Sequence, residues 1–213
     1  MYIQDRFREE RLETLHTFMR AHALATLIVS APRLEAFLMP IEIVNEGAKG
    51  LLRGHVVRTN SLWMNSATNT NALAVFQGSN AYISPRWYVN GQRSGRVAPS
   101  WNFSTVHASG PLRFIDDPHW VYQHLASLAE AHESHRDDPW RLADAPAEFI
   151  EGLIERLVGI EIEIVHLEGK FFLSQQRTGE DRDSIVARLR TEPLASALDV
   201  ARDIHQASAP DDL

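Results

Sequence analysis

Residues 73–85, LAVFQGSNAYISP, and residues 100–115, SWNFSTVHASGPLRFI, decide the fold class of this chain. Both stretches are rich in the β-branched and aromatic residues that strands favour. The first predicts a hairpin of strands 73–78 and 80–85. The second predicts another strand, which follows a Gly/Arg-rich loop at 90–99. Together they predict an antiparallel sheet or barrel in the middle of the chain.

Strands and helices are expected on both sides of this sheet. Apolar residues at helical spacing in 5–22 predict one helix of about 16 residues. Further strands are predicted at 24–31, 36–44, 50–57 and within 158–175 with a turn at Glu168–Gly169, a short helix and loop at 60–71, and helices at 117–135, 145–157, 180–189 and 193–205. The fold class is therefore mainly β with peripheral helices (α+β). We expect a single domain over 1–205 with helical C-terminal additions, followed by a disordered tail at 206–213.

The strand that begins near residue 158 shows a period of two. Ile160, Ile162 and Ile164 alternate with Glu161 and Glu163. Such alternation is typical of a strand with one buried face and one face in water. We therefore expect both glutamates to be solvated.

Composition excludes several classes of protein. The chain has 213 residues and no cysteine, so disulfide scaffolds, cysteine-zinc sites and thiol catalysis are excluded. No apolar run reaches the roughly 18 residues that a membrane span requires. Charged residues occupy the N-terminus where a secretory peptide would be apolar, so we expect a cytoplasmic protein without a membrane partner.

Charge is divided unevenly along the chain. Residues 47–115 hold seven Lys or Arg and no Asp or Glu, whereas residues 116–213 hold nine Lys or Arg and 21 Asp or Glu. Three of the five Trp and seven of the eight Asn also lie in 47–115. One interpretation is a surface for a planar anionic ligand. The alternative is a basic face that neutralises the acidic C-terminal third.

The segment GHVVRTN, residues 54–60, is a candidate phosphate site. His55, Arg58 and Asn60 lie where a predicted strand runs into a turn. A guanidinium offers a planar fork to phosphate oxygens, and imidazole and amide groups can complete the shell. The alternative is an Arg on a strand edge with His55 as a buried polar residue.

Other motifs give no catalytic site. Walker, Rossmann and G-x-S-x-G patterns are absent from the sequence. His132 and His135 are followed by Asp137 and Asp138, but without a third defined ligand we favour a solvated helix end over a metal site. We therefore expect no metal, and catalytic residues stay unknown.

Four blocks resemble the signature blocks of the PaiB family, described as FMN-binding negative transcriptional regulators. They are GHVVRTNSLW (54–63), LAVFQGSNAYISPRWY (73–88), VAPSWNFSTVHASG (97–110) and EGKFFLSQQRTGEDR (168–182). The segments around Ala25, Pro40, His55 and Asn60 are similar to the broader pattern of flavin-binding split barrels. The resemblance implies an FMN-binding split β-barrel and a homodimer with FMN at the subunit interface.

The resemblance also implies a set of cofactor-binding residues. His55, Arg58 and Asn60 would hold the FMN phosphate. The remaining expected contacts to the ring, the ribityl chain or the partner subunit are Gln77, Ser84, Trp87, Trp101, Asn102, Lys170, Gln175 and Arg177. One position departs from the family pattern, because Leu38 stands where relatives carry His before Met39–Pro40. Loss of that imidazole leaves open whether flavin is retained. A separate alternative is that haem, and not FMN, is the bound group.

The resemblance leads to two hypotheses about function, one a regulator and the other an enzyme. The family description favours a regulator that senses FMN or a metabolite, and the alternative is a flavin-dependent oxidoreductase acting on a small molecule, with any regulation indirect. Every predicted helix is acidic or balanced in charge, whereas DNA readers usually present a basic helix. We therefore expect direct DNA binding to be weak and strongly salt-dependent, or absent.

Overall fold

The computed structural model describes residues 1–30, 33–65 and 70–207. Part of the loop expected at 60–71, and the tail expected at 206–213 from residue 208 on, lie outside the described residues. In the described part of the chain, no helix is long and apolar enough to cross a membrane.

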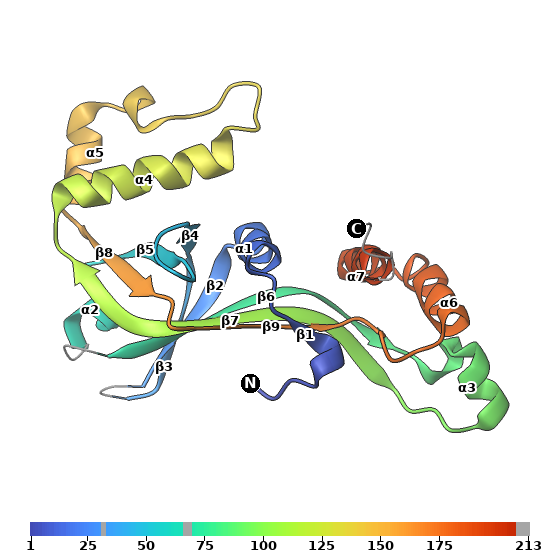
Figure 1. Cartoon of the computed structure of the whole chain (residues 1–213). Coiled ribbons are helices and arrows are strands. Elements are labelled where there is room, and N and C mark those ends of the chain that lie inside the picture. Colours follow the sequence, from blue (N-terminus) through green and yellow to red (C-terminus); the bar gives the residue numbers. More distant parts are fainter. Residues whose placement is uncertain (31–32, 66–69, 208–213) are drawn as a thin grey trace. The chain divides into compact units, whose positions relative to one another are not determined.

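The chain divides into two compact units, and strands β6 (Asn71–Ile83) and β7 (Ser100–Ile115) run through both (Figure 1). The first unit comprises Met1–Phe18, Gln77–Val106 and the chain from Glu168 onward. The second unit comprises Met19–Phe76 and His107–Leu167.

The strands form an antiparallel sheet with the order β3-β2-β6-β7-β8-β5-β4, and β9 pairs with both β7 and β1. Their bounds are β1 (Arg8–Glu9), β2 (Leu24–Val29), β3 (Glu35–Pro40), β4 (Glu42–Val44), β5 (Leu51–Val57), β8 (Leu157–Glu163) and β9 (His166–Phe172). The antiparallel sheet with helices confirms the predicted fold class.

The second unit leaves one face of β2, β3 and β6 uncovered within the described residues. Side chains of β2 alternate, and Ala25, Leu27 and Val29 are buried. Cross-strand partners lie on the same face, and Thr26 pairs with both Leu38 and Val75. This outward sheet face also carries Leu24, Ile28 and Leu73, and Leu38 is 68% exposed.

Strand β8 differs from the alternation seen in the sequence. Six of its seven residues are buried, and Glu161 is only 3% exposed. The reason is that β8 lies between β5 and β7, where Arg53 and Arg113 stand directly opposite Glu161 in register. Both guanidinium groups form ion pairs with the carboxylate, the Arg53 Nε to Oε1 distance being 2.9 Å. The prediction that Glu161 is solvated is wrong, because two cations compensate its burial.

The first unit packs helices against the end of β6. Its core contains Ala81 and Ile83 of β6, Tyr88, Leu173, and residues from both C-terminal helices. The helical elements of this unit are η1 (Asp5–Phe7), the start of α1 (Leu12–Ala21), η2 (Pro85–Trp87), α3 (Val89–Ser94), α6 (Gly179–Leu189) and α7 (Ala195–Gln206). Helix α6 contacts α7, α3 and η2.

Three local predictions are corrected by these bounds. Residues 5–22 do not form one helix, because Arg8 and Glu9 form strand β1 opposite Lys170 and Gly169 of β9. The predicted turn at Glu168–Gly169 lies inside β9 instead. Residues 90–94 of the predicted loop belong to helix α3.

The predicted hairpin within 73–85 is also absent from the structure. Residues 71–83 form the single strand β6. Its buried positions are Ala72, Ala74 and Phe76, and then Ala81 and Ile83, so the alternation changes parity between Phe76 and Ala81. The turn-forming residues 78–80 mark this change of buried face and not a reversal of the chain.

Helices of the second unit cover its sheet at β5 and β8. They are α2 (Ser61–Asn65), α4 (Pro118–Glu133), η3 (Leu142–Asp144) and α5 (Ala147–Ile154). Helix α4 begins at the cap Asp117, whose side chain accepts a hydrogen bond from the His119 N–H. Trp120, in its first turn, donates its indole N–H to Glu161 Oε1 at 3.2 Å.

The Trp120 ring lies directly on the backbone of β8 at Gly159. A Cβ at this position would come within 2.1 Å of Trp120 Cζ3, which is far inside van der Waals contact. Glycine is therefore required here for the close approach of α4.

We expect Gly159→Ala to lower the free energy of unfolding by about 1–3 kcal/mol, the usual cost of overpacking, because Trp120 must move. Gly152→Ala is the matched control: its Cβ would meet nothing within 4 Å, and alanine is favoured inside a helix by up to about 1 kcal/mol. Urea unfolding measures both. Equal stabilities for the two variants would contradict the packing described for Trp120.

Candidate functional site

The predicted phosphate ligands lie in the second unit, where β5 ends and α2 begins. Asn60 is the cap of α2: its Oδ1 accepts the Leu62 N–H at 2.9 Å, and its carbonyl accepts from Trp63 and Met64. This is the ordinary role of Asn before a helix. The Asn60 side-chain NH2 group has no partner among the described residues.

Arg58 follows the last residue of β5 and is bound on two sides. Its Nε donates to the Glu155 carbonyl at the C-terminal end of α5, at 2.7 Å. Its two terminal nitrogens bind the two oxygens of Asp116, the Nη1 to Oδ2 distance being 3.0 Å. Two guanidinium N–H groups, one on each terminal nitrogen, have no partner in the part of the chain that the structure describes.

His55 contacts a second histidine and not Arg58. Its Nδ1 lies 3.1 Å from Nε2 of His124 on α4. The Nδ1 of His124 lies 3.4 Å from Oε2 of Glu42, and Ser127 donates to the other oxygen of Glu42. Trp120 stacks on the His124 ring at a centroid distance of 5.2 Å. Three elements, β4, β5 and α4, thus meet at a histidine pair in which His124 is buried and His55 half-buried.

Burial and the neighbouring His124 lower the pKa of His55 from 6.5 to about 4. His55 is therefore neutral at physiological pH. The Glu42 carboxylate favours a proton on the facing His124 nitrogen, so His124 Nε2 accepts and His55 Nδ1 donates. The outer nitrogen of His55 is then an acceptor, which does not suit a phosphate oxygen.

The remaining predicted contacts lie in the first unit. Ser84 caps η2 by accepting the Arg86 N–H at 3.3 Å, and Trp87 packs on the core. Gln77 is exposed in the interior of β6, not at a strand end as predicted. In the described part of the chain, no side-chain hydrogen bond, ion pair or ring contact joins any of these three residues to another predicted FMN-binding residue.

Trp101 and Asn102 are neighbours on β7 with opposite environments. Trp101 is exposed and its ring meets that of exposed Tyr82 edge-on, at 6.0 Å. Asn102 is 1% exposed and its amide nitrogen donates to Ser174 Oγ at 2.9 Å. Ser174 has a φ of 63°, a conformation that is uncommon for residues other than glycine. Asn102 therefore holds an internal turn, whereas Trp101 offers a ring to a planar partner.

The three residues predicted after β8 are bound within the first unit. Lys170 donates to the Tyr2 carbonyl at 3.3 Å and lies over the Phe103 ring. Gln175 closes its own turn through the Leu173 N–H and the Phe171 carbonyl. Arg177 stacks on the buried Tyr88 ring at 4.1 Å.

The Arg177–Tyr88 stack joins two of the sequence blocks. Burial raises the pKa of Tyr88 despite the neighbouring guanidinium, and Arg177 Nε is buried without a hydrogen-bond partner among the described residues. Asp181 of α6 accepts the Asn90 N–H at 2.9 Å. The blocks 73–88 and 168–182 are thus brought together by packing and hydrogen bonds.

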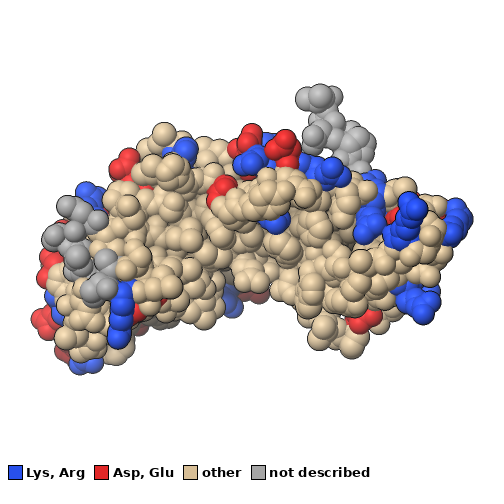
Figure 2. Space-filling view, turned by 90° about the horizontal axis from the view of Figure 1, so that it is seen from below, with Lys and Arg blue, Asp and Glu red and all other residues tan. Residues whose placement is uncertain are grey.

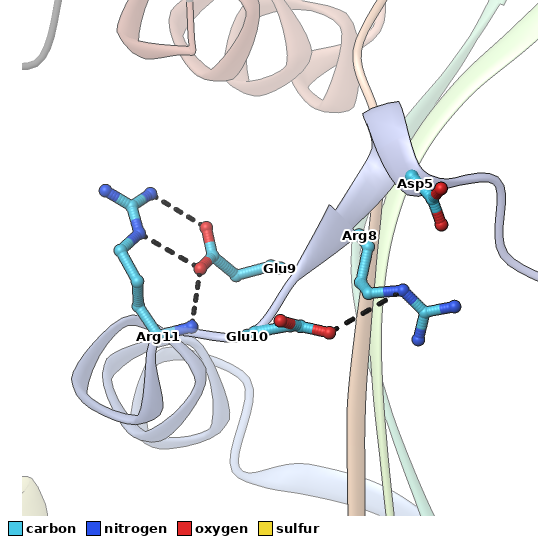
Figure 3. Close-up of a pocket in the computed structure, with 5 residues that line it drawn as sticks. All are labelled: Asp5, Arg8, Glu9, Glu10 and Arg11. Atoms are coloured by element: carbon cyan, nitrogen blue, oxygen red, sulfur yellow. Dashed lines mark hydrogen bonds and ion pairs between the residues drawn. The ribbon is translucent and has the colours of Figure 1, made fainter.

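A shallow cavity of about 470 Å³ lies in the first unit at residues Asp5 and Arg8–Arg11. Figure 3 shows Arg11 turned toward Glu9 and Arg8 turned toward Glu10. Burial opposes ionisation of Glu9, but the bonds from Arg11 outweigh it and lower the Glu9 pKa. Three carboxylates against two paired guanidiniums make this cavity unsuitable for a phosphate.

Ion pairs account for most of the basic segment 47–115. Arg53 and Arg113 bind Glu161, Arg58 binds Asp116, and Arg93 binds Glu180. All these acids come from the acidic C-terminal part of the chain. The ion pairs of these four arginines therefore favour neutralisation of the acidic C-terminal part of the chain over a surface for an anionic ligand. Arg86 and Arg96 are exposed.

Two residues that matter at this site were missed by sequence reasoning. His124 and Asp116 are the partners of His55 and Arg58 and lie 69 and 58 positions away. A signal existed for His124, because Trp120 and Val121 precede it by four and three positions, a spacing that places all three on one helix face. No local signal marks Asp116, which stands beside the better helix cap Asp117.

A flavin phosphate needs N–H donors and positive charge. The described residues supply the donors, since Arg58 keeps two N–H groups and Asn60 keeps its amide. They supply little net charge, because Asp116 compensates Arg58 and His55 is neutral. The residues therefore fit a phosphate by hydrogen bonding, with its electrostatic attraction reduced.

Comparison with known proteins agrees with the fold. The FAD and heme binding protein from Mycobacterium smegmatis superimposes with a TM-score of 0.59 at 14% identity, covering 85% of this chain and 80% of that one. The conserved hypothetical protein Rv2991 from Mycobacterium tuberculosis gives 0.56 at 11% identity, covering 81% and 91%. The fold is a split β-barrel of the kind found in flavin-binding proteins.

Sequence comparison identifies the family. Residues 1–166 match the family described as "Putative FMN-binding domain", and the chain belongs to this family. A Bacillus subtilis (strain 168) relative, Protease synthase and sporulation protein PAI 2, is 25% identical over 202 residues, covering 94% of this chain and 95% of that protein. This confirms the PaiB resemblance seen in the sequence blocks.

We expect the half-buried His55 to make stability depend on pH. The unfolded pKa of 6.5 exceeds the folded value of about 4, so the unfolded chain binds the proton more tightly and stability falls as pH drops below 6.5. Between pH 7.5 and pH 5 the loss from His55 is ~2 kcal/mol.

Urea unfolding of wild type and His55→Gln at the two pH values measures this loss. His55→Gln should flatten the dependence, whereas the exposed control His132→Gln should keep it. An NMR titration in which His55 gains its proton near pH 6.5 would contradict the burial described here.

Proposed function

We propose that this protein binds FMN and that Arg58 and Asn60 hold its phosphate group. The observation that carries the proposal is that, among the described residues, Arg58 keeps two unpartnered guanidinium N–H groups and Asn60, two positions later in the same turn after β5, keeps its side-chain NH2 group. Support comes from the family, since this segment lies within the matched residues 1–166. His55 serves to dock α4 and is not a phosphate donor in this proposal.

The proposed assembly is a homodimer with FMN at the interface. The outward face of β2, β3 and β6 in the second unit supports it, because Leu24 and Leu38 are exposed large apolar residues on adjacent strands. Figure 2 shows uncharged residues over much of the face in view. Such apolar surfaces are commonly buried in two-fold interfaces.

Bound FMN would supply redox chemistry itself, so the chain needs only to bind and orient it. We propose regulation with FMN or a metabolite as the sensed ligand, which agrees with the name of the Bacillus subtilis relative, a protease synthase and sporulation protein. The second candidate is a flavin-dependent oxidoreductase acting on a small molecule. The exposed Trp101–Tyr82 pair favours it, because an open aromatic surface suits a planar ligand.

We expect one FMN per subunit, with Arg58→Ala weakening binding by ~1.5–3 kcal/mol, the usual worth of hydrogen bonds to a charged group. Flavin fluorescence and visible absorption follow the titration, and riboflavin, which lacks the phosphate, should not distinguish the variant. Arg156→Ala removes an exposed guanidinium nearby and is the matched control. Failure of wild type to bind FMN would overturn the proposal.

We expect no sequence-selective binding of duplex DNA at physiological salt. The helices of the described chain are short of basic residues, and Arg93 of α3 is engaged by Glu180. Fluorescence anisotropy with promoter-length duplexes at two salt concentrations measures the affinity and its salt slope. A nanomolar, sequence-selective complex at physiological salt would show that regulation is direct.

A further inference from the structure

Arg58 lies where three segments of the second unit meet. Its backbone N–H donates to the Arg156 carbonyl at 2.8 Å, and its Nε donates to the Glu155 carbonyl at 2.7 Å. A cation at the C-terminal end of a helix is favourably placed against the helix dipole. These two bonds fix the position of the guanidinium whether or not a carboxylate faces it.

Asp116 occupies the fork of this guanidinium. It lies between the end of β7 and the cap of α4, and both of its oxygens face the two terminal nitrogens of Arg58. A phosphate uses the same fork in the same bidentate way. The hydrogen bonds and charge of Arg58 also lower the pKa of Asp116, so the carboxylate is ionised at neutral pH.

The Arg58–Asp116 pair is exposed enough to exchange partners. The two side chains are 37% and 49% exposed, and such surface pairs are worth little in net stability. Glu161 is the contrast within the same sheet, because its side chain is 4% exposed and two guanidiniums hold it. Water can reach both partners of the Arg58–Asp116 pair, whereas the Glu161 carboxylate is shielded from water although its partner Arg113 is exposed.

We propose that Asp116 is a built-in competitor that sets the affinity and selectivity of the Arg58 site for phosphate groups. A phosphate binds by displacing the Asp116 carboxylate from the guanidinium fork or by binding beside it, and in both cases the negative charge of Asp116 opposes it. This inference rests on the proposed phosphate site and adds a residue that neither the sequence blocks nor the family description assigns.

The test compares Asp116→Asn with Asp117→Asn. Both variants remove one negative charge at adjacent positions, but Asp117 caps α4 and asparagine preserves that cap. FMN, riboflavin and inorganic phosphate are titrated separately, with fluorescence for the flavins and thermal shift for phosphate. Arg58→Ala and the Arg58→Ala/Asp116→Asn double variant complete a double-mutant cycle.

We expect Asp116→Asn to bind FMN about three- to tenfold tighter, as expected from release of an exposed pair and loss of one nearby like charge. Riboflavin affinity should not change, and Asp117→Asn should behave as wild type. The gain should vanish in the Arg58→Ala background. The melting temperature of ligand-free Asp116→Asn should be no higher than that of wild type, because the ion pair is lost.

The outcomes separate this inference from the proposed function. If no variant binds FMN but phosphate raises the melting temperature of Asp116→Asn more than that of wild type, the competitor role stands and FMN is the wrong ligand. If FMN binds wild type and Asp116→Asn equally, FMN binding stands and the competitor role is overturned. An equal gain in riboflavin affinity would also overturn it, since riboflavin has no phosphate.

Discussion

A carboxylate buried in the middle of the sheet is the constraint on which the second unit depends. Glu161 stands directly opposite Arg53 on one side and Arg113 on the other, so one charge fixes the register of β5, β8 and β7 together. The Trp120 indole N–H donates to the same carboxylate and so attaches helix α4 to these strands. Removal of one partner from a buried ion pair typically costs about 3–5 kcal/mol, and a slip of register by one residue would separate all these groups. Helix α4, which provides the partner of His55, is therefore positioned by an interaction made in the sheet.

The ion pairs of this unit differ in exposure, and this difference decides whether a ligand can reach them. The Glu161 carboxylate is buried and both of its oxygens are held by arginines, so its role is to specify the strand order. The Arg58 pair lies at a strand end, where the guanidinium keeps donors to spare. The uneven charge along the sequence is thus used in two ways. Basic residues of the middle segment and acids of the C-terminal part hold the fold together, and one of these pairs also lies where a phosphate is proposed to bind.

The sequence predicts the element types better than it predicts their partners. Strand β7 and the four helices after it were predicted within a few residues, because their apolar spacing and caps are local signals. The hairpin in 73–85 was wrong because Gly78–Asn80, a strong local turn signal, lies inside the single strand β6, which has β2 and β7 as neighbours. Glu161 was misplaced because its burial depends on two arginines from other strands. The family was recognisable from the blocks, whereas the partners of His55 and Arg58 depend on contacts 69 and 58 residues apart, which no window of sequence contains.

The stack of Trp120 on His124 has an optical consequence. An indole in contact with an imidazole changes its emission when the imidazole gains a proton or moves away, so the docking of α4 on β5 and β8 carries its own fluorescent reporter. Of the five tryptophans, Trp120 is the one whose ring contacts both a histidine and the strand backbone at Gly159. Replacing the other four with phenylalanine would leave a chain whose natural emission reports the state of this helix without an added dye.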